Sequence, residues 1–265
     1  MMFTEQVVYG LPYMTAPNIE TAHAFTTRFG GVSGGVYETL NLGQNLGDDP
    51  ECVKENYRRL CNALGISEAD IVCQRQVHGA DVRVVTDTDR GKLYSVTDNE
   101  GDGLITASPD VALTVFTADC AAILLYDAVC GVIGAVHAGW RGTAADIAGA
   151  AVRKMAGEFG CTDIKAAVGP CISKCCFETD SDVADALYGA LGTQADKCLE
   201  RRGDKFMVDI KEANRLTLIR AGLKAGNIAI SDECTFCRSD KYWSHRRTKG
   251  IRGTQAAIIS CPRMI

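Results

Sequence analysis

Three apolar segments follow one another with very short connections, and this feature constrains the fold more than any other. The segments cover residues 111–117, 121–126 and 132–137. They are rich in valine, isoleucine and threonine, which favours β-strands over helices. Their connections, residues 118–120 and 127–131, are short enough to favour antiparallel pairing of consecutive strands. The middle of the chain therefore predicts three strands of an antiparallel sheet.

Further strands and helices are predicted on both sides of this centre. The predicted strands cover residues 22–27, 71–77, 82–85, 164–168, 228–230 and 254–260, and the second and third should pair around His78 and Gly79. The predicted helices cover residues 49–64, capped by Asp49 and ended by Gly65, and residues 144–159, 182–191 and 210–221. Strands and helices mix without a strict βαβ rhythm. We therefore expect one α/β domain, residues 1–265, folded as a sandwich rather than as a Rossmann sheet.

The acidic charge balance limits the partners of the chain. The formal net charge is -5 and the pI is about 5.4, whereas general binding to nucleic acid or acidic membranes needs an excess of lysine and arginine. The sequence contains no apolar run close to the roughly 20 residues that span a bilayer, and its first residues do not resemble a signal peptide. We expect a cytoplasmic monomer that binds a small molecule, and neither nucleic acid nor membrane.

The chain has 13 cysteines, and five of them invite a zinc interpretation. Cys234 and Cys237 have the C-x-x-C spacing of a zinc ligand pair, and Cys171 with Cys175 could supply the other two ligands. However, the glycine, lysine and proline residues that flank zinc-ribbon turns are missing around Cys234. Without a signal peptide, free thiols in a reducing compartment are the expected state. We therefore interpret these cysteines, Cys176 included, as ordinary thiols.

A different set of side chains suggests a metal centre. The chain has only four histidines, of which His23 lies inside a predicted strand and is interpreted as structural. His78, Cys120 and His137 all stand at the ends of predicted strands, where active-site rims are often built. Two imidazoles and one thiolate suit Zn²⁺ or copper, and three protein ligands leave a fourth position open. Their spacing is not a short chelating motif, so buried or capping roles are the alternative.

Arginines near glycine-rich turns suggest an anion site. Arg141 lies in a Gly-Trp-Arg-Gly segment before the predicted helix 144–159, whose N-terminal amides could bind an anion with it. Arg28 lies in a glycine-rich turn, and Arg246 and Arg247 lie near the C-terminus. The alternative for each is a solvated surface charge. Convergence of several arginines beside a metal would favour phosphate recognition.

A series of motifs runs in order along almost the whole chain. They are TTRFGGVS (26–33), NLG (41–43), QVHG (76–79), DG (102–103), TADC (117–120), HAGWRG (137–142), GPCI (169–172), FE (177–178) and SHRR (244–247). The combination closely resembles the laccase-domain family, also called the multicopper polyphenol oxidase-like or YfiH/YlmD family. The resemblance implies an α/β/β/α sandwich with mixed sheets. It also implies a metal held by His78, Cys120 and His137. His245 stands where the family has a tyrosine, and its role is left open.

The family resemblance implies three kinds of activity. Members are described as purine nucleoside phosphorylases with adenosine deaminase side activity, as copper-dependent phenol oxidases, and as peptidoglycan-editing factors. A laccase combines a type 1 copper with a trinuclear cluster and needs on the order of ten histidines for its ligands, whereas this chain has four. A single zinc beside arginines suits phosphorolysis, or deamination by a zinc-activated water, better. A zinc-dependent hydrolase of peptidoglycan precursors and a non-catalytic, metal-stabilised binding protein are further alternatives.

For phosphorolysis, the sequence nominates substrate-binding and catalytic residues around the metal ligands. We expect phosphate to be bound by Arg28, Arg141 and Arg247, and the sugar or base by Asn41 and Gln76. The residues expected to be catalytic are the metal ligands His78, Cys120 and His137 together with Asp119. Asp119 or Asp102 could orient a ligand or accept a proton. For Asp102 the alternative is an ordinary turn residue.

Overall fold

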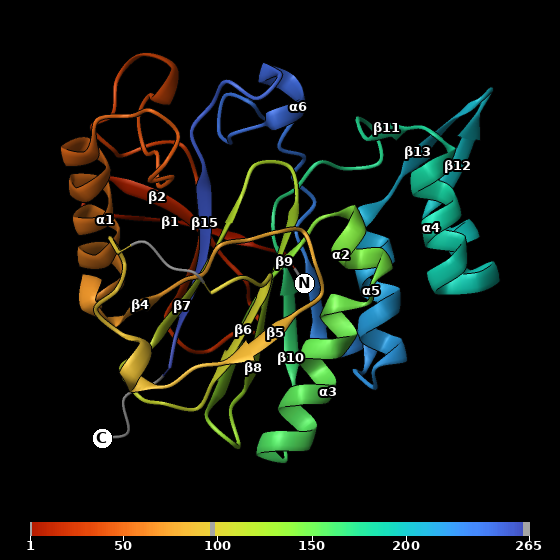
Figure 1. Ribbon diagram of the computed structural model, residues 1–265, viewed down its shortest axis with the longest axis horizontal. Coiled ribbons are helices and arrows are strands. Elements are labelled where there is room, and N and C mark those ends of the chain that lie inside the picture. Colours follow the sequence, from red (N-terminus) through yellow and green to blue (C-terminus); the bar gives the residue numbers. More distant parts are fainter. Residues whose placement is uncertain (1, 96–98, 262–265) are drawn as a thin grey trace.

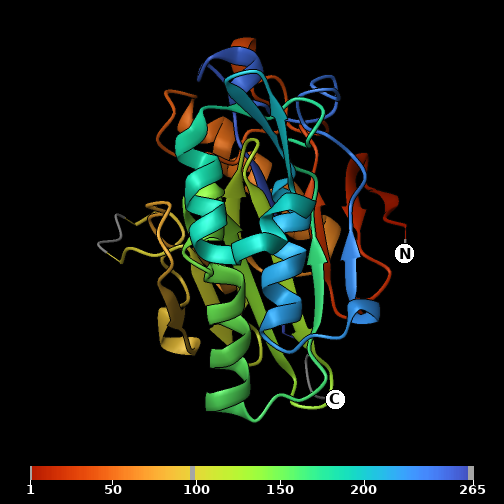
Figure 2. The ribbon, with the colours of Figure 1, turned by 90° about the vertical axis from the view of Figure 1, so that its right-hand side faces the viewer.

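The chain forms two mixed sheets that are stacked face to face, with helices on both outer faces (Figure 1). This is a computed structural model, and it describes residues 2–95 and 99–261. The helix α1 (Pro50–Leu64) covers the outside of one sheet, and α3 (Ile147–Phe159) and α5 (Ile210–Arg220) cover the outside of the other. Figure 2 views α3 and α5 in front of the sheet that they cover. The predicted α/β/β/α sandwich with mixed sheets is confirmed.

The first sheet has six strands. In spatial order they are β1 (Thr4–Val8), β2 (Leu11–Thr15), β3 (His23–Thr26), β15 (Gln255–Ser260), β7 (Ala112–Thr117) and β4 (Ile71–Val72). All neighbours pair antiparallel except β4 and β7, which are parallel. The C-terminal strand β15 therefore lies in the middle of a sheet that the N-terminal hairpin begins.

The second sheet also has six strands. Their order is β14 (Ile228–Ile230), β10 (Lys165–Val168), β8 (Ala121–Asp127), β9 (Val132–Ala138), β6 (Gly103–Thr106) and β5 (Val82–Val84). The outer pairs β10–β14 and β5–β6 are parallel and the inner pairs antiparallel. The central strands β8 and β9 are buried along their whole length, which explains their continuous apolar sequences.

Smaller elements complete the fold. A three-stranded sheet in the order β11 (Glu178–Thr179), β13 (Lys205–Val208) and β12 (Leu199–Arg202) lies beside α4 (Ser181–Leu191) at the edge of the molecule (Figure 1). The other helices are α2 (Trp140–Ala144) and α6 (His245–Thr248). The 3-10 turns are Gly35–Tyr37, Glu68–Asp70, Asp87–Asp89, Gly192–Lys197 and Ala225–Asn227. None of the helices within the described ranges is long and apolar enough to cross a membrane.

Apolar side chains fill the space between the layers. Leu104, Leu113, Leu124 and Ile259 are fully buried between the two sheets. A second cluster joins the outer face of the second sheet to α3 and α5, and a third joins α1 to the first sheet. Because each layer covers an apolar face of its neighbour, the sandwich buries continuous hydrophobic surface across its whole thickness.

Two predicted strand pairings are wrong, and both corrections bear on the site. Segments 111–117 and 121–126 are strands, but β7 belongs to the first sheet and β8 to the second, so they do not pair. Likewise β4 and β5 lie in different sheets, paired with β7 and β6. A short connection can be a hairpin or a corner between stacked sheets, and sequence spacing does not distinguish the two. Only β8 and β9 form the predicted antiparallel pair.

The predicted helices are present with small changes. Asp49 caps α1 by accepting a hydrogen bond from the Glu51 amide, and Gly65 ends the helix in the left-handed conformation. The predicted helix 144–159 corresponds to α3 and begins three residues later, at Ile147, because Asp146 adopts a left-handed conformation that separates α3 from the short helix α2. The strands β1, β2 and β6 and the three-stranded edge sheet were not predicted.

Candidate metal centre

Both stacked sheets contribute to one cluster of metal-binding side chains. His78 lies in the loop between β4 and β5, Cys120 in the corner between β7 and β8, and His137 near the end of β9. Their ligand atoms all lie within 4.8 Å of one another. The two imidazole rings are nearly perpendicular, with centroids 4.8 Å apart. The structure thus brings together the three predicted ligands, and a nitrogen–nitrogen–sulfur donor set of this kind fits a transition metal.

Asp102 fixes two of these ligands. Its buried carboxylate lies 2.7 Å from Nδ1 of His137 and accepts hydrogen bonds from three successive backbone amides of the His78 turn. His78 itself has a left-handed backbone, with φ of 60°, which a non-glycine residue rarely adopts without such support. With Nδ1 of His137 held by Asp102, Nε2 is the nitrogen left for a metal. Asp102 therefore has the orienting role of a carboxylate–histidine–metal arrangement.

Glycines allow the ligand loops to approach each other closely. A Cβ atom at Gly139 would lie 3.1 Å from both Sγ of Cys120 and Cδ2 of His78, and one at Gly142 would lie 2.7 Å from the carbonyl oxygen of Gly79. The contact at Gly142 is closer than real Cβ atoms show, and the contacts at Gly139 are tight enough that the two ligand side chains would have to shift. The Gly-Trp-Arg-Gly segment therefore serves to bring backbone against the metal-binding side chains.

Asp119 holds the corner that positions Cys120. Its carboxylate accepts hydrogen bonds from the Thr235 hydroxyl at 2.6 Å, the Ser244 hydroxyl at 3.1 Å and the Arg246 amide at 2.7 Å. Asp119 is buried, and its φ of 86° is left-handed. The sequence suggested Asp119 as a catalytic residue or a partner of a histidine. In the structure, the carboxylate that contacts His137 is that of Asp102. Asp119 instead links the corner between β7 and β8 to the C-terminal segment.

The neighbours of Cys120 favour its thiolate. Burial opposes ionisation of Cys120, but hydrogen bonds and charge from His137 and His78 outweigh burial and lower the pKa of Cys120 to about 6. Burial also opposes a charged imidazole at His137, whereas Asp102 and Cys120 raise the pKa of His137 to about 9. Without metal, the two side chains therefore form a thiolate–imidazolium pair at neutral pH. A metal cation would take the place of the imidazolium proton.

The three ligands open onto one cavity of about 670 Å³. Its volume lies in the range of roughly 300–1,000 Å³ that is common for small-molecule sites. Most of the exposed wall surface is apolar, with Phe116, Trp140 and Phe177 among the lining residues, and polar and charged side chains such as Arg246 and Arg252 are set into it. A flat, partly polar molecule fits such a surface.

Of the five residues predicted to bind substrate, only Gln76 lines this cavity. The lining is formed by Leu42, Gly43, Gln44, Asn45, Leu46, Cys73, Gln74, Arg75, Gln76, His78, Leu93, Ser95, Phe116, Thr117, Ala118, Asp119, Cys120, His137, Gly139, Trp140, Ile172, Phe177, Ile210, His245, Arg246, Arg252 and Thr254. The Gln76 side chain both donates to and accepts from the backbone of Phe116, at 2.8 and 2.7 Å. The side-chain amide of Gln76 therefore uses these hydrogen bonds to attach the loop of His78 to β7.

Arg28 and Asn41 have structural roles. The Arg28 guanidinium donates to the backbone carbonyls of Glu38 and Ser239 and lies over the ring of Trp243. The Asn41 side chain is fully buried and bonds Asp48 and the backbone of its own turn. Their polar groups already have protein partners and neither residue lines the cavity, so their contact with substrate stays a prediction from the sequence.

Arg141 and Arg247 are also not among the residues that line the cavity. Each is exposed and lies against an aromatic ring, Arg141 over Trp140 and Arg247 over Phe236. The neighbouring Arg246 lines the cavity instead, and its guanidinium donates to the carbonyl of Glu178. The sequence identified the Arg-Arg pair correctly but not which member faces the site.

Two lining residues that the sequence analysis missed carry unpaired polar atoms. Within residues 2–95 and 99–261, Nε of Arg252 and Oε1 of Gln74 are buried without a hydrogen-bond partner. Arg252 also interacts electrostatically with Asp119 and Cys120, and burial lowers the pKa of its guanidinium. Its position just before the predicted strand 254–260 was a usable indication, because the metal ligands also stand at strand ends.

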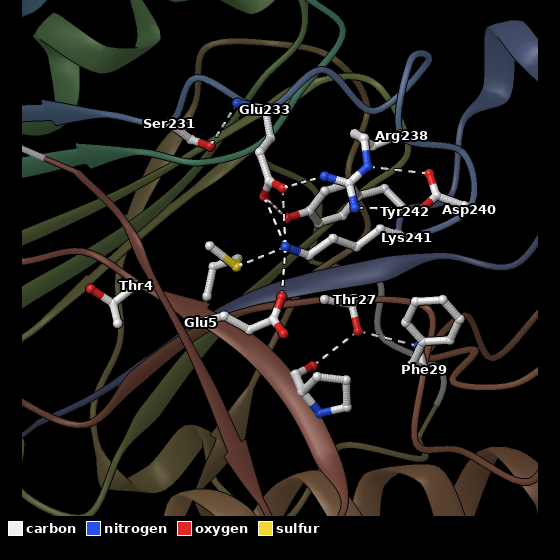
Figure 3. A network of polar contacts seen from close by, with 12 residues as sticks. Thr4, Glu5, Thr27, Phe29, Ser231, Glu233, Arg238, Asp240, Lys241 and Tyr242 are labelled. Carbon is white, nitrogen blue, oxygen red and sulfur yellow. Dashed lines mark hydrogen bonds and ion pairs between the residues drawn. The ribbon is translucent and has the colours of Figure 1, made fainter.

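The C-terminal segment that carries His245, Arg246 and Arg252 is anchored by a polar network (Figure 3). Lys241 is buried and forms ion pairs with Glu233 at 3.0 Å and with Glu5 of β1 at 2.7 Å. Tyr242 donates a hydrogen bond to Glu233, and burial together with Glu233 raises the pKa of Tyr242. This network ties the loop before α6 to the first sheet and fixes one wall of the cavity.

Comparison with known proteins identifies the family. Residues 22–262 match the family described as multi-copper polyphenol oxidoreductase laccase. The chain belongs to this family. It is 42% identical over 255 residues to a purine nucleoside phosphorylase of Deinococcus radiodurans, covering 96% of this chain and 94% of the relative. It is 34% identical over 240 residues to adenosine deaminase RL5 of an unknown prokaryotic organism, covering 88% of this chain and 91% of the relative.

A solved member of the laccase-domain family has the same fold. The crystal structure of YlmD from Geobacillus stearothermophilus superimposes with a TM-score of 0.93 at 37% identity, covering 98% of this chain and 99% of that one. The family resemblance inferred from the motifs is thus confirmed, and so is the fold that it implied.

The ligands expected of a multicopper laccase are not available in this member of the laccase-domain family. Of its four histidines, His23 is buried with one ring nitrogen 2.8 Å from the amide of Ala16 and the other 2.8 Å from the carbonyl of Thr21. Three imidazoles remain, far fewer than the roughly ten that a type 1 copper and a trinuclear cluster need.

Proposed function

We propose that this protein is a zinc-dependent purine nucleoside phosphorylase that cleaves adenosine or inosine with phosphate. The observation that carries the proposal is that His78, Cys120 and His137 open onto a single cavity whose wall combines aromatic rings with arginines. Relatives across nearly the whole chain bear the name purine nucleoside phosphorylase, which supports the same assignment.

The proposed metal is Zn²⁺, held by Nε2 of His137, the His78 imidazole and Sγ of Cys120. This donor set matches catalytic zinc sites with three protein ligands. When bound there, zinc would supply a Lewis acid beside the cavity. Asp102 keeps His137 in the orientation and tautomer that a metal requires.

Phosphate is assigned to Arg252 and Arg246. Both guanidinium groups belong to the cavity wall, and Arg252 has a buried Nε donor without a partner in the described chain. A charge-assisted hydrogen bond to phosphate would satisfy this donor. Nη1 of Arg252 donates to the carbonyl of Gly253 and to the hydroxyl of Thr254, and these two hydrogen bonds hold the guanidinium in place.

The purine base is assigned to the aromatic part of the wall. Phe116 and Phe177 offer flat apolar surface for the ring system. Oε1 of Gln74 is a buried acceptor without a partner among the described residues, and its amide nitrogen is already fixed to the carbonyl of Gly103. It can accept a hydrogen bond from an N–H group of the base.

In the proposed reaction, a phosphate oxygen attacks the anomeric carbon of the ribose while the bond from that carbon to the purine nitrogen breaks. The bonding electrons move to the base, which takes up one proton, and ribose 1-phosphate is the second product. His245 is assigned to this proton exchange. Among the described lining residues it is the imidazole outside the metal set, and Asp119 already accepts three hydrogen bonds.

Adenosine deamination at the same site is a secondary activity of the proposal, supported by the similarity to adenosine deaminase RL5. Water would replace the amino group of adenosine, releasing ammonia and inosine. This reaction benefits from a free carboxylate that shuttles protons. The carboxylate on the described part of the wall, Asp119, is fully engaged, so we expect deamination to be slower than phosphorolysis.

The test is an assay of zinc-loaded protein with adenosine or inosine, with and without phosphate, followed by chromatography of the products. Free base that forms only with phosphate, and is lost in His78→Ala, supports the proposal. Turnover of phenols or of peptidoglycan precursors, with none of nucleosides, would replace it with the oxidase or the hydrolase alternative. Full nucleoside turnover in a metal-free His78→Ala protein would reject the metal-dependent scheme.

A cytoplasmic location, a monomeric state and the absence of a nucleic-acid partner stay predictions from composition and charge.

A further inference from the structure

Four cysteines form a second cluster outside the catalytic cavity. Cys175 and Cys176 lie in the turn between β10 and β11, and Cys234 and Cys237 lie in the loop before α6. Their four sulfur atoms all lie within 4.8 Å of one another. Cys171, which the sequence analysis considered as a ligand, is buried beside Cys234 but outside this group, and Cys176 takes its place.

The sulfur spacing suits a tetrahedral metal ion. A Zn–S bond of about 2.3 Å and tetrahedral angles place the sulfur atoms of a four-cysteine site about 3.8 Å apart. Sγ of Cys237 lies 3.7 Å from Sγ of Cys175 and 3.3 Å from Sγ of Cys176. Sulfur atoms in a disulfide are much closer, at about 2.05 Å. The cluster therefore has the dimensions of a site that encloses an ion.

A backbone amide is directed at one of these sulfur atoms. The amide of Ser173, in the turn that carries Cys175 and Cys176, donates to Sγ of Cys234 at 3.3 Å. This hydrogen bond joins the two cysteine-bearing segments and provides a donor that stabilises negative charge on a metal-bound sulfur.

The turn that carries Cys234 and Cys237 is held rigidly at its base. The residues on either side of it, Glu233 and Arg238, form an ion pair at 3.2 Å (Figure 3). Within the turn, the Thr235 hydroxyl donates to Asp119, which precedes Cys120. In the other segment of the cluster, Cys176 is followed directly by Phe177, which lines the cavity. The cluster thus joins two segments that both reach the catalytic cavity.

We propose that Cys175, Cys176, Cys234 and Cys237 bind a structural zinc ion, separate from the metal held by His78, Cys120 and His137. Four protein ligands leave no open position, so this ion is structural rather than catalytic. It fixes the turn of residues 173–176 to the loop before α6 and thereby supports the wall formed by Phe177 and Arg246. The interpretation of these cysteines as ordinary thiols is replaced by this proposal.

The test is the zinc content of the purified protein by elemental mass spectrometry. Cys237→Ser should hold one zinc fewer per chain than the wild type, whereas Cys52→Ser, a thiol outside the cluster, should hold as much. The exposed side chain of Cys237 makes the substitution mild for packing. Zinc content in Cys237→Ser equal to that of the wild type would overturn the proposal.

A second measurement does not depend on folding of the cysteine variants. His78→Ala protein, which lacks a ligand of the catalytic centre, should still carry one zinc. Titration of its thiols with a mercurial reagent should release that zinc, and substitution with Co²⁺ should give the absorption bands of tetrahedral sulfur coordination. His78→Ala protein without zinc, and without these bands on addition of Co²⁺, would overturn the proposal whatever the activity of the enzyme.

Discussion

The carboxylate of Asp102 lies 2.7 Å from Nδ1 of His137, while the same carboxylate holds the backbone of the His78 turn. One buried side chain thus orients two candidate ligands. These come from the two neighbours of β6 in the sheet: His78 lies in the loop that leads into β5, and His137 lies in β9. The metal centre therefore depends on the second sheet being fully assembled.

Asp102→Asn should lower zinc affinity about 10- to 100-fold, the usual effect of losing an outer partner of a metal-bound histidine. Its measurement is competition with a chelator, with thermal unfolding recorded in parallel. Asp127→Asn is the matched control, because Asp127 is also buried and accepts backbone amides of Val129, Cys130 and Asp163, away from the site. Equal zinc affinities in the two variants would contradict the role given to Asp102.

Gly139→Ala should reduce both metal binding and turnover, because the new methyl group would lie 3.1 Å from Cys120 and from His78. Gly157→Ala serves as the control. Gly157 lies on the exposed face of α3, and no atom would lie within 4 Å of the new methyl group. There alanine should stabilise the helix by roughly 0.5–1 kcal/mol. Full zinc occupancy and activity in Gly139→Ala would show that the close approach at residue 139 is not needed.

Arg252→Gln should raise the KM for phosphate at least about tenfold, since a hydrogen bond to a charged group contributes about 1.5–3 kcal/mol. Arg28→Gln should leave this KM unchanged and lower the melting temperature instead, because Arg28 bonds backbone carbonyls outside the cavity. Steady-state kinetics with varied phosphate distinguish the two. A larger effect on KM from Arg28 than from Arg252 would restore the prediction made from sequence.

Cys120 should react with iodoacetamide in mildly acidic solution when metal is absent. Its neighbours lower the pKa of Cys120 to about 6, so the thiolate and its reactivity persist as the pH falls towards that value. Cys52, whose pKa burial and nearby carboxylates raise, should react only in alkaline solution. Peptide mapping by mass spectrometry follows each site, and zinc should protect Cys120. Alkylation of Cys120 with the pH dependence of an ordinary thiol would contradict the thiolate–imidazolium pair.

The sequence nominated His78, Cys120 and His137 as metal ligands because each follows or ends an apolar segment, and the structure brings the three side chains together. Strand ends are visible in a sequence, whereas side-chain direction is not. Arg28 and Arg141 lie in glycine-rich motifs beside the site, yet their guanidinium groups turn to Ser239 and to Trp140. Arg252 reaches the cavity through the pairing of β15 with β3 and β7, strands more than a hundred residues away.

The corner at Asp119 shows why part of the topology was missed. Its short sequence reads like a hairpin connection, but the side chain of Asp119 is bonded by Thr235 and Ser244 from the far end of the chain. The loop of Thr235 also carries Cys234 and Cys237, whose partners Cys175 and Cys176 lie about sixty residues earlier in the sequence. Such long-range partners determine the site and are not encoded in local periodicity.

The most direct test of the account is the product balance of the zinc-loaded enzyme with inosine and phosphate. We predict equal amounts of hypoxanthine and ribose 1-phosphate, with one phosphate consumed for each, and loss of this turnover in His78→Ala but not in Cys52→Ser. No nucleoside cleavage by protein with its metal in place, or cleavage that does not require phosphate, would contradict the central claim.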